Sequence, residues 1–315
     1  MAGSCATHCL PVITLRALNM PDSHYIGRFA PTPSGYLHFG SLLAALASYL
    51  DARARKGRWL VRMEDLDSPR NLPGADEHIL RTLRAYGLHW DGEVVRQSQR
   101  LARYQQIIDR WLDQGLAYYC DCSRREIIAQ DGIYPGTCRQ RQLSAAPDHA
   151  IRVRVEDTEI TFVDRLQGPL SRNLSSDCGD FIIRRRDGII AYQLAVVIDD
   201  IDQGVTDIVR GADLLDSTPR QLRLYQLLQQ PAPRYLHVPL IMRQDGEKLS
   251  KRLGSAPLEA AQAAATLYQA LCILTPTAPA SLRSATIDQQ LQWAIAHWQP
   301  TRLPAARQIM DPAQG

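Results

Sequence analysis

The sequence predicts an α/β protein with a parallel sheet that is interrupted by an insertion and followed by a short helical region. Short apolar runs alternate with amphipathic helical patterns over residues 25–114, and such alternation is typical of βαβ units. The alternation stops over residues 118–180, where cysteines cluster among turn residues and short β-like runs. It returns over residues 181–242 and then gives way to an Ala- and Leu-rich stretch.

The first half of the sheet begins with a strand over residues 25–30, which the turn residues of 31–35 follow. A helix is expected over residues 41–55, because apolar residues recur there at helical spacing and form one face. The residues of that face are Leu42, Leu43, Leu46, Tyr49 and Leu50. The other elements predicted for this half are a strand over 58–64 and helices over 75–86 and 100–114.

The second half is expected to repeat this pattern after the insertion. The insertion itself carries β-like runs at 151–155 and 160–163. The later elements are strands over 181–183, 205–209 and 237–242, helices near 192–199 and over 219–229, and two or three helices within 258–298. Residues 299–315 contain three prolines and are expected to form a tail.

These elements divide the chain into five parts. They are an N-terminal extension, expected to be poorly ordered, over 1–23; the first half of the α/β domain over 24–117; the insertion over 118–180; the second half over 181–255; and a short helical C-terminal region with a tail over 256–315.

The composition is that of an ordinary globular protein. Apolar residues make up 45% and charged residues 22% of the 315 residues, which excludes a disordered or fibrous chain. The net charge of +3 is too small for a surface covered with nucleic-acid contacts. No run of about 18 apolar residues occurs, so no membrane contact is expected. The seven unevenly spaced cysteines do not form a disulfide framework, so reduced thiols and a cytoplasmic location are expected.

The first motif of chemical interest runs from Arg28 to Ser41 and reads RFAPTPSGYLHFGS. It has the order strand, tight turn, helix start, and a helix N-terminus presents unpaired N–H groups that suit phosphate. Gly40 permits close approach of a ligand to the backbone, and His38 could donate to a phosphate oxygen. The alternative is an ordinary turn in which Ser41 caps the helix.

The second motif is GEKLSKR at residues 246–252. Only three of the 36 basic residues are lysines, and two of these, Lys248 and Lys251, lie here. Three cations and the hydroxyl of Ser250 could clamp a triphosphate and neutralise charge that develops at phosphorus. A solvated basic loop is the alternative.

Three cysteines suggest a metal site in the insertion. Cys120, Cys122 and Cys138 fall within 19 residues and offer three soft ligands to a tetrahedral zinc ion, which needs a fourth. Water, Asp121 and His149 are candidates for the fourth ligand. Coincidental spacing of free thiols is the alternative.

Taken together, the two loop motifs resemble the HIGH and KMSKS signatures of class I aminoacyl-tRNA synthetases, which lie on an interrupted Rossmann fold. The stretch from Arg28 to Ser41 is similar to the glutamyl and glutaminyl branch, in which the last HIGH histidine is often absent; Ser41 occupies that place here. Three further segments resemble the same branch: RMEDLD at 62–67, AYQLAVVIDD at 191–200 and VRGADL at 209–214.

The resemblance implies roles for individual residues. Arg28, Tyr192 and Arg210 would bind the side-chain carboxylate of glutamate, and Thr32 and Glu64 its α-amino end. The implied glutamate site is completed by Phe29, Ala30 and Pro31. The implied ATP-binding residues are His38, Gly40, Ser41, Lys248, Ser250 and Lys251, of which Lys251, with Lys248 and His38, would act in catalysis. Tyr134 is the implied fourth ligand of one structural zinc ion.

The length of the chain bears on the expected substrate. Only 63 of the 315 residues follow Arg252, too few for the anticodon-binding region of a discriminating glutamyl- or glutaminyl-tRNA synthetase. The chain therefore resembles truncated glutamyl-type paralogues that act on queuosine in tRNA(Asp). That resemblance implies activation of L-glutamate by ATP and Mg²⁺ without tRNA, transfer to the cyclopentene-diol of queuosine, and a monomeric enzyme. Two alternatives are a truncated synthetase that charges a tRNA acceptor end and a non-catalytic tRNA-binding module.

Overall fold

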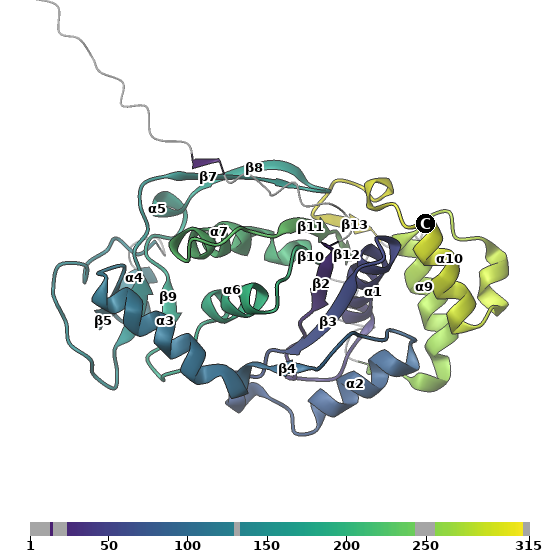
Figure 1. Cartoon of the computed structure of the whole chain (residues 1–315), viewed down its shortest axis with the longest axis horizontal. Helices are drawn as coiled ribbons and strands as arrows, with labels where there is room; N and C mark the ends of the chain where they lie inside the picture. Colours follow the sequence, from purple (N-terminus) through teal and green to yellow (C-terminus); the bar gives the residue numbers. More distant parts are fainter. Residues whose placement is uncertain (1–12, 15–23, 129–132, 243–255, 311–315) are drawn as a thin grey trace, which may run out of the picture.

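The computed structural model describes residues 13–14, 24–128, 133–242 and 256–310. The predicted α/β class with parallel strands is confirmed. In Figure 1 the parallel strands occupy the middle of the molecule, between the C-terminal helices at one end and the insertion at the other. No helix in these described ranges combines the length and apolar character that crossing a bilayer requires.

Two parallel sheets lie edge to edge at the centre. One contains β2 (Ile26–Phe29), β3 (Arg58–Met63) and β4 (Val95–Arg96). The other pairs β10 (Asp207–Gly211) with β11 (Arg234–Val238). The backbone N–H of Thr206 donates to the carbonyl of Ile26 at 2.9 Å and joins the two. The amino ends of β2 and β10 thus lie side by side although about 180 residues separate them.

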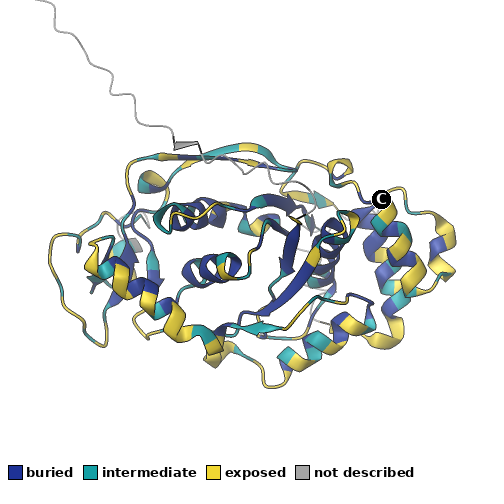
Figure 2. Ribbon diagram, in the orientation of Figure 1, coloured by how far each residue is buried: buried dark blue, intermediate teal, exposed yellow. Residues whose placement is uncertain are grey.

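Buried helices cover these strands. The longest, α1 (Phe39–Ala54), packs against β2, β3 and β10 and buries Leu42, Leu46 and Leu50 almost completely. The helices α6 (Tyr192–Asp202) and α7 (Thr218–Leu227) pack on each other and are dark blue along most of their length in Figure 2. The more exposed helices are α2 (Ala75–Ala85) and α3 (Leu101–Asp113). The helices predicted for the two halves therefore form, with ends that differ from the prediction by at most three residues.

The insertion contributes to two sheets. The strands β5 (Ala117–Cys120), β6 (Ala150–Val153) and β9 (Ile182–Arg184) form an antiparallel sheet. The hairpin of β7 (Glu159–Asp164) and β8 (Gly168–Asn173) instead joins β11. Pairing thus crosses the boundary expected at residue 180, because strand partners are chosen by packing in space and not by order along the chain. The short helices here are α4 (Arg124–Ile128) and α5 (Leu174–Asp177).

The C-terminal region packs α9 (Ala263–Leu274) and α10 (Ile287–His297) against α1. The remaining short segments are 3₁₀ helices: Ser68–Arg70, Gln97–Arg100, Ala212–Ser217, Ala260–Gln262, Ala280–Ser284 and Pro300–Arg302.

Two expectations about the chain ends are wrong in part. Gln308–Met310, expected as tail, form β13, which pairs in parallel with β12 (Leu240–Met242). Just before this strand, Arg307 makes a bidentate ion pair with Asp216 at 2.8 and 2.9 Å. Ile13–Thr14, within the extension for which no element was expected, form β1 beside β7, where the edge of β7 offers backbone partners.

Candidate active site

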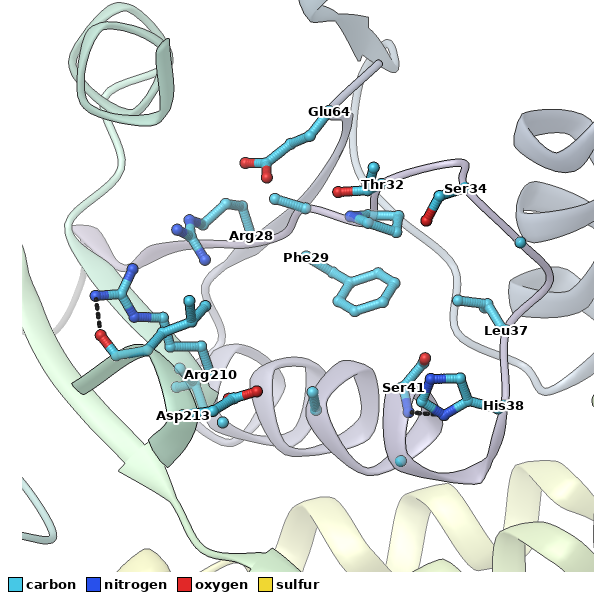
Figure 3. Close-up of a pocket in the computed structure, with 18 of the residues that line it drawn as sticks. Arg28, Phe29, Thr32, Ser34, Leu37, His38, Ser41, Glu64, Arg210 and Asp213 are labelled. Atoms are coloured by element: carbon cyan, nitrogen blue, oxygen red, sulfur yellow. Dashed lines mark hydrogen bonds between the residues drawn. The ribbon is translucent and has the colours of Figure 1, made fainter. Parts of the chain in front are cut away.

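A cleft of about 760 Å³ opens at the carboxyl ends of β2, β3 and β10, where ligands bind in open α/β sheets. Figure 3 shows its walls: the turn after β2, the start of α1, the end of β3, and the end of β10. All predicted glutamate- and ATP-binding residues that the structure describes line this one cleft. They are Arg28, Phe29, Ala30, Pro31, Thr32, His38, Gly40, Ser41, Glu64, Tyr192 and Arg210.

Two buried guanidinium groups stand at one end of the cleft. Arg28 is 4% exposed and donates from Nε and Nη2 to Asp200 at 3.1 and 3.4 Å. Arg210 is 5% exposed; its Nε donates to His237 at 2.9 Å, and its Nη2 donates to Thr218 at 2.9 Å. Within the described part of the chain, Nη1 of Arg210 has no hydrogen-bond partner. A carboxylate would satisfy this buried donor.

His237 and Asp164 hold Arg210 in place, and sequence reasoning missed both. His237 Nδ1 lies 2.7 Å from the Asp164 carboxylate, and burial lowers the pKa of His237 to about 4. The neutral ring therefore donates from Nδ1 and accepts from Arg210 at Nε2. His237 stood in an apolar strand pattern, and nothing in the sequence connected it to Arg210.

Glu64 lies at the end of β3 and is 9% exposed. Its Oε1 atom is 3.7 Å from Nη2 of Arg62 and lacks a hydrogen-bond partner among the described residues. Burial raises the pKa of Glu64 to about 7, although Arg62 and Arg28 favour its ionised form. A carboxylate in this state has room for a cationic ligand, and an α-ammonium group fits that description.

The other end of the cleft faces the N-terminus of α1. His38 is the N-cap residue, and its Nδ1 accepts from the backbone N–H of Ser41 at 3.2 Å. The alternative in which Ser41 caps the helix is therefore wrong. Burial lowers the pKa of His38, so the ring is neutral at pH 7 with its proton on Nε2. This leaves Nε2 as a donor beside a helix N-terminus, an arrangement suited to phosphate.

The motif at residues 246–252, with Lys248, Ser250 and Lys251, falls outside the described residues. The roles expected for them stay predictions. Leu240 of β12 lines the cleft shortly before that segment in sequence.

Gly211 and Asp213 also line the cleft, and no role was predicted for either. A Cβ on Gly211 would lie 2.7 Å from Oδ1 of Asp213 and 3.3 Å from Leu240, so a larger residue here would displace the Asp213 side chain. Both residues stood inside the VRGADL segment, which was the available signal.

A second candidate centre lies in the insertion. The Sγ atoms of Cys120, Cys122 and Cys138 lie within 4.8 Å of one another, and the group could hold a metal ion. The phenol oxygen of Tyr134 is 3.4 Å from the first sulfur and 3.8 Å from the second, and it accepts from the Cys138 N–H at 2.9 Å. Arg152 donates to Cys120 Sγ at 3.2 Å, which stabilises a thiolate.

The other candidates for a fourth ligand are placed less well. Both carboxylate oxygens of Asp121 accept from Arg141, at 2.6 and 2.8 Å, although one also lies 3.3 Å from Cys138 Sγ. His149 Nδ1 lies 2.9 Å from the Ser144 carbonyl. Of the protein side chains considered, Tyr134 is therefore the best placed to complete the cluster.

Comparison with known proteins agrees with this geometry. Residues 26–275 match the family model of the catalytic domain of class I tRNA synthetases (E and Q). The chain is 59% identical to the glutamyl-Q tRNA(Asp) synthetase of Ectopseudomonas mendocina (strain ymp) over 92% of this chain and 98% of the relative. It is also 59% identical to the glutamyl-Q tRNA(Asp) synthetase of Pseudomonas aeruginosa PAO1, over 90% of this chain and 96% of the relative.

Solved structures show the same fold. The glutamate tRNA ligase of Elizabethkingia meningosepticum, solved in complex with its amino acid, superposes with a TM-score of 0.76 at 25% identity, over 92% of this chain and 67% of that one. The glutamate-tRNA synthetase of Elizabethkingia anophelis superposes with a TM-score of 0.77 at 25% identity, over 92% of this chain and 68% of that one. The chain belongs to the glutamyl-Q tRNA(Asp) synthetase family of class I aminoacyl-tRNA synthetases.

Proposed function

We propose that the protein activates L-glutamate with ATP in the absence of tRNA and transfers it to the cyclopentene-diol of queuosine in the anticodon of tRNA(Asp). One observation carries the proposal: two buried arginines and a buried, partly unsatisfied carboxylate share a cleft with the N-terminus of α1. Support for the acceptor comes from relatives at 59% identity that are named for glutamyl-Q tRNA(Asp) synthesis.

Glutamate fits the cleft by charge. Its side-chain carboxylate would accept from Arg28, Arg210 and the hydroxyl of Tyr192, because guanidinium groups bind carboxylates through paired hydrogen bonds. Its ammonium group would lie against Glu64, with Thr32 at the more exposed edge. Backbone at Phe29, Ala30 and Pro31 would form the wall between these charged ends.

The first chemical step joins glutamate to AMP. An α-carboxylate oxygen attacks the α-phosphorus of ATP in line, a C–O–P link forms, and pyrophosphate leaves with its Mg²⁺. His38 Nε2, the backbone N–H at Gly40 and the hydroxyl of Ser41 would hold phosphate oxygens. Lys251, helped by Lys248 and the Ser250 hydroxyl, would neutralise charge on the phosphates. No side chain becomes covalently bonded, so catalysis depends on positioning and electrostatics.

The second step transfers the acyl group. A hydroxyl of the cyclopentene-diol attacks the carbonyl carbon of the mixed anhydride, its proton is lost, and AMP leaves. We expect a monomeric, cytoplasmic enzyme to carry out both steps.

The cysteine cluster would bind one zinc ion through Cys120, Cys122, Cys138 and Tyr134. Three thiolates and a phenol oxygen suit zinc, and a set of four protein ligands leaves no open position for substrate. The role proposed for this ion is therefore structural: it would tie the start of the segment between β5 and β6 to the middle of that segment.

The experiment uses purified full-length protein and labelled glutamate. We expect glutamate-dependent ATP–pyrophosphate exchange without any tRNA, and label on queuosine-containing tRNA(Asp) but not on the same tRNA lacking queuosine. Nuclease mapping should place the label in the anticodon fragment. Label at the 3′ end of tRNA(Glu) would instead identify a truncated glutamyl-tRNA synthetase, the activity named for the solved relatives. Absence of all exchange would indicate a non-catalytic protein.

A further inference from the structure

Asp200, on α6, lies between two buried arginines. Its carboxylate accepts from Nε and Nη2 of Arg28 at 3.1 and 3.4 Å and forms an ion pair with Nη1 of Arg62 at 2.8 Å. Asp200 is 1% exposed and is absent from the cleft lining, whereas Arg28 lines the cleft. Asp200 therefore acts on a ligand in the cleft through neighbouring side chains, and Arg28 is the cleft residue to which it is hydrogen-bonded.

The bidentate contact with Asp200 constrains the orientation of the Arg28 guanidinium group. A guanidinium group is planar and carries five N–H donors in a fixed fork. Asp200 occupies the Nε edge, and neither of its two hydrogen bonds uses Nη1. The orientation of Nη1 relative to the cleft is thus set by a buried carboxylate that does not itself meet the ligand.

Charge balance gives Asp200 a second effect. Arg28 and Glu64 both line the cleft, and their charges attract each other. Without the Asp200 carboxylate as a partner, Arg28 would turn toward Glu64. The group proposed to bind the carboxylate of glutamate and the group proposed to bind its ammonium would then neutralise each other. Asp200 keeps them apart by supplying Arg28 with a competing partner.

We propose that Asp200 is a positioning residue for amino-acid recognition: by holding Arg28 away from Glu64, it sets selectivity for a side-chain carboxylate over the corresponding amide. The inference rests on the proposed function, in which Arg28 binds that carboxylate.

Asp199 provides a matched control on the same helix. It is also fully buried and lies 3.6 Å from Arg62. Its hydrogen bonds come from elsewhere, namely from Gln97, Arg100 and Tyr104 at 2.7–2.9 Å. Neutralising Asp199 therefore removes a comparable buried charge from the same network while leaving the bidentate contact to Arg28 in place.

The test compares full-length Asp200→Asn and Asp199→Asn with the wild type in ATP–pyrophosphate exchange, with glutamate and then glutamine as substrate. For Asp200→Asn we expect KM for glutamate to rise about tenfold or more and the preference for glutamate over glutamine to fall by a similar factor, the scale of one charge-assisted contact. KM for ATP should change less than about twofold. Asp199→Asn should lower the Tm and keep the glutamate preference.

Equal loss of glutamate preference in both variants would reduce Asp200 to a structural role, and an unchanged preference in Asp200→Asn would overturn the proposal. Should Asp200→Asn fail to fold, Asp200→Glu keeps the charge and moves it, and glutamate-induced change in Tm then reports binding. Here too an unaltered preference for glutamate contradicts the proposal. Absence of exchange in the wild type would refute the proposed function itself, which separates the two failures.

Discussion

The Oε1 atom of Glu64 lies 3.7 Å from the guanidinium of Arg62, too far for a hydrogen bond. Arg62 lies within β3 and Glu64 directly follows the strand, and both side chains are buried. Desolvation outweighs the attraction of Arg62 and Arg28, and the pKa of Glu64 is raised to about 7. The cleft therefore holds a carboxyl group that is only about half ionised at neutral pH before a ligand arrives.

This state predicts how glutamate activation depends on pH. An ammonium group binds the carboxylate and not the neutral acid, so kcat/KM for glutamate should fall about tenfold per pH unit below a break near 7. The measurement is exchange activity from pH 5.5 to 8.5 at saturating ATP. Glu64→Gln should be weakly active with a flat profile across this break. A wild-type profile without a break between pH 5.5 and 8.5 would contradict the raised pKa.

The same group predicts a gain in stability on mutation. The folded-state pKa lies above the unfolded value, so the contribution of Glu64 is favourable below about pH 4.5 and is lost as the pH rises through about 7. Without ligand, Glu64→Gln should therefore be more stable than wild type at pH 8, by up to about 3 kcal/mol. Urea unfolding at pH 8 and pH 4.5 measures the difference, which should shrink or vanish at the lower pH.

The parts of the site that could be predicted are those held in continuous segments. The strand–turn–helix stretch from Arg28 to Ser41 places its own residues, so local turn and capping preferences suffice to bring His38 and Gly40 near Thr32. Glu64 was expected in the site from the resemblance of RMEDLD to the glutamyl branch, and its position at a strand end agrees with where ligands bind in parallel sheets. Each of these residues lies in a continuous segment that can be compared with the family directly.

The parts that could not be predicted depend on long-range pairing. Asp200 contacts Arg28 across 172 positions, and Asp164 contacts His237 across 73. Asp200 follows another aspartate on a helix, and nothing in the neighbouring sequence indicates that its partner is Arg28. The strand β13 was missed for the same reason, since three residues pair only because β12 offers an open edge.

Lys251 should dominate the electrostatic stabilisation of adenylate formation. Its role rests on sequence alone, because the segment lies outside the described residues. Lys251→Ala is expected to lower the exchange rate by about 100-fold or more, the scale for losing one preorganised contact to developing charge. Lys56→Ala, at an exposed position after α1, should leave the rate unchanged. A loss below twofold for Lys251→Ala would contradict the assigned role.

The cysteine cluster should bind about one zinc ion per chain by elemental analysis, and a Cys120→Ser, Cys122→Ser double variant should lose it. Tyr134→Phe separates the candidates for the fourth ligand: it should release zinc to a chelator at least about tenfold more readily than wild type. Asp121→Asn is the control and should hold zinc as the wild type does. Metal-free protein with full activity and unchanged Tm would refute a structural ion.

His38 combines two tasks that two substitutions can separate. Its Nδ1 caps α1 through Ser41, while Nε2 takes no part in that bond and would donate to a phosphate. Asparagine is a good N-cap residue, since its side-chain oxygen can replace Nδ1, but it has no atom at the place of Nε2.

We therefore expect His38→Asn to keep the wild-type Tm, whereas His38→Ala should lose about 1 kcal/mol of stability. Both variants should lower kcat for exchange by about 10- to 100-fold, because both lack the Nε2 donor. Full activity in His38→Asn would mean that His38 serves the enzyme only as a helix cap.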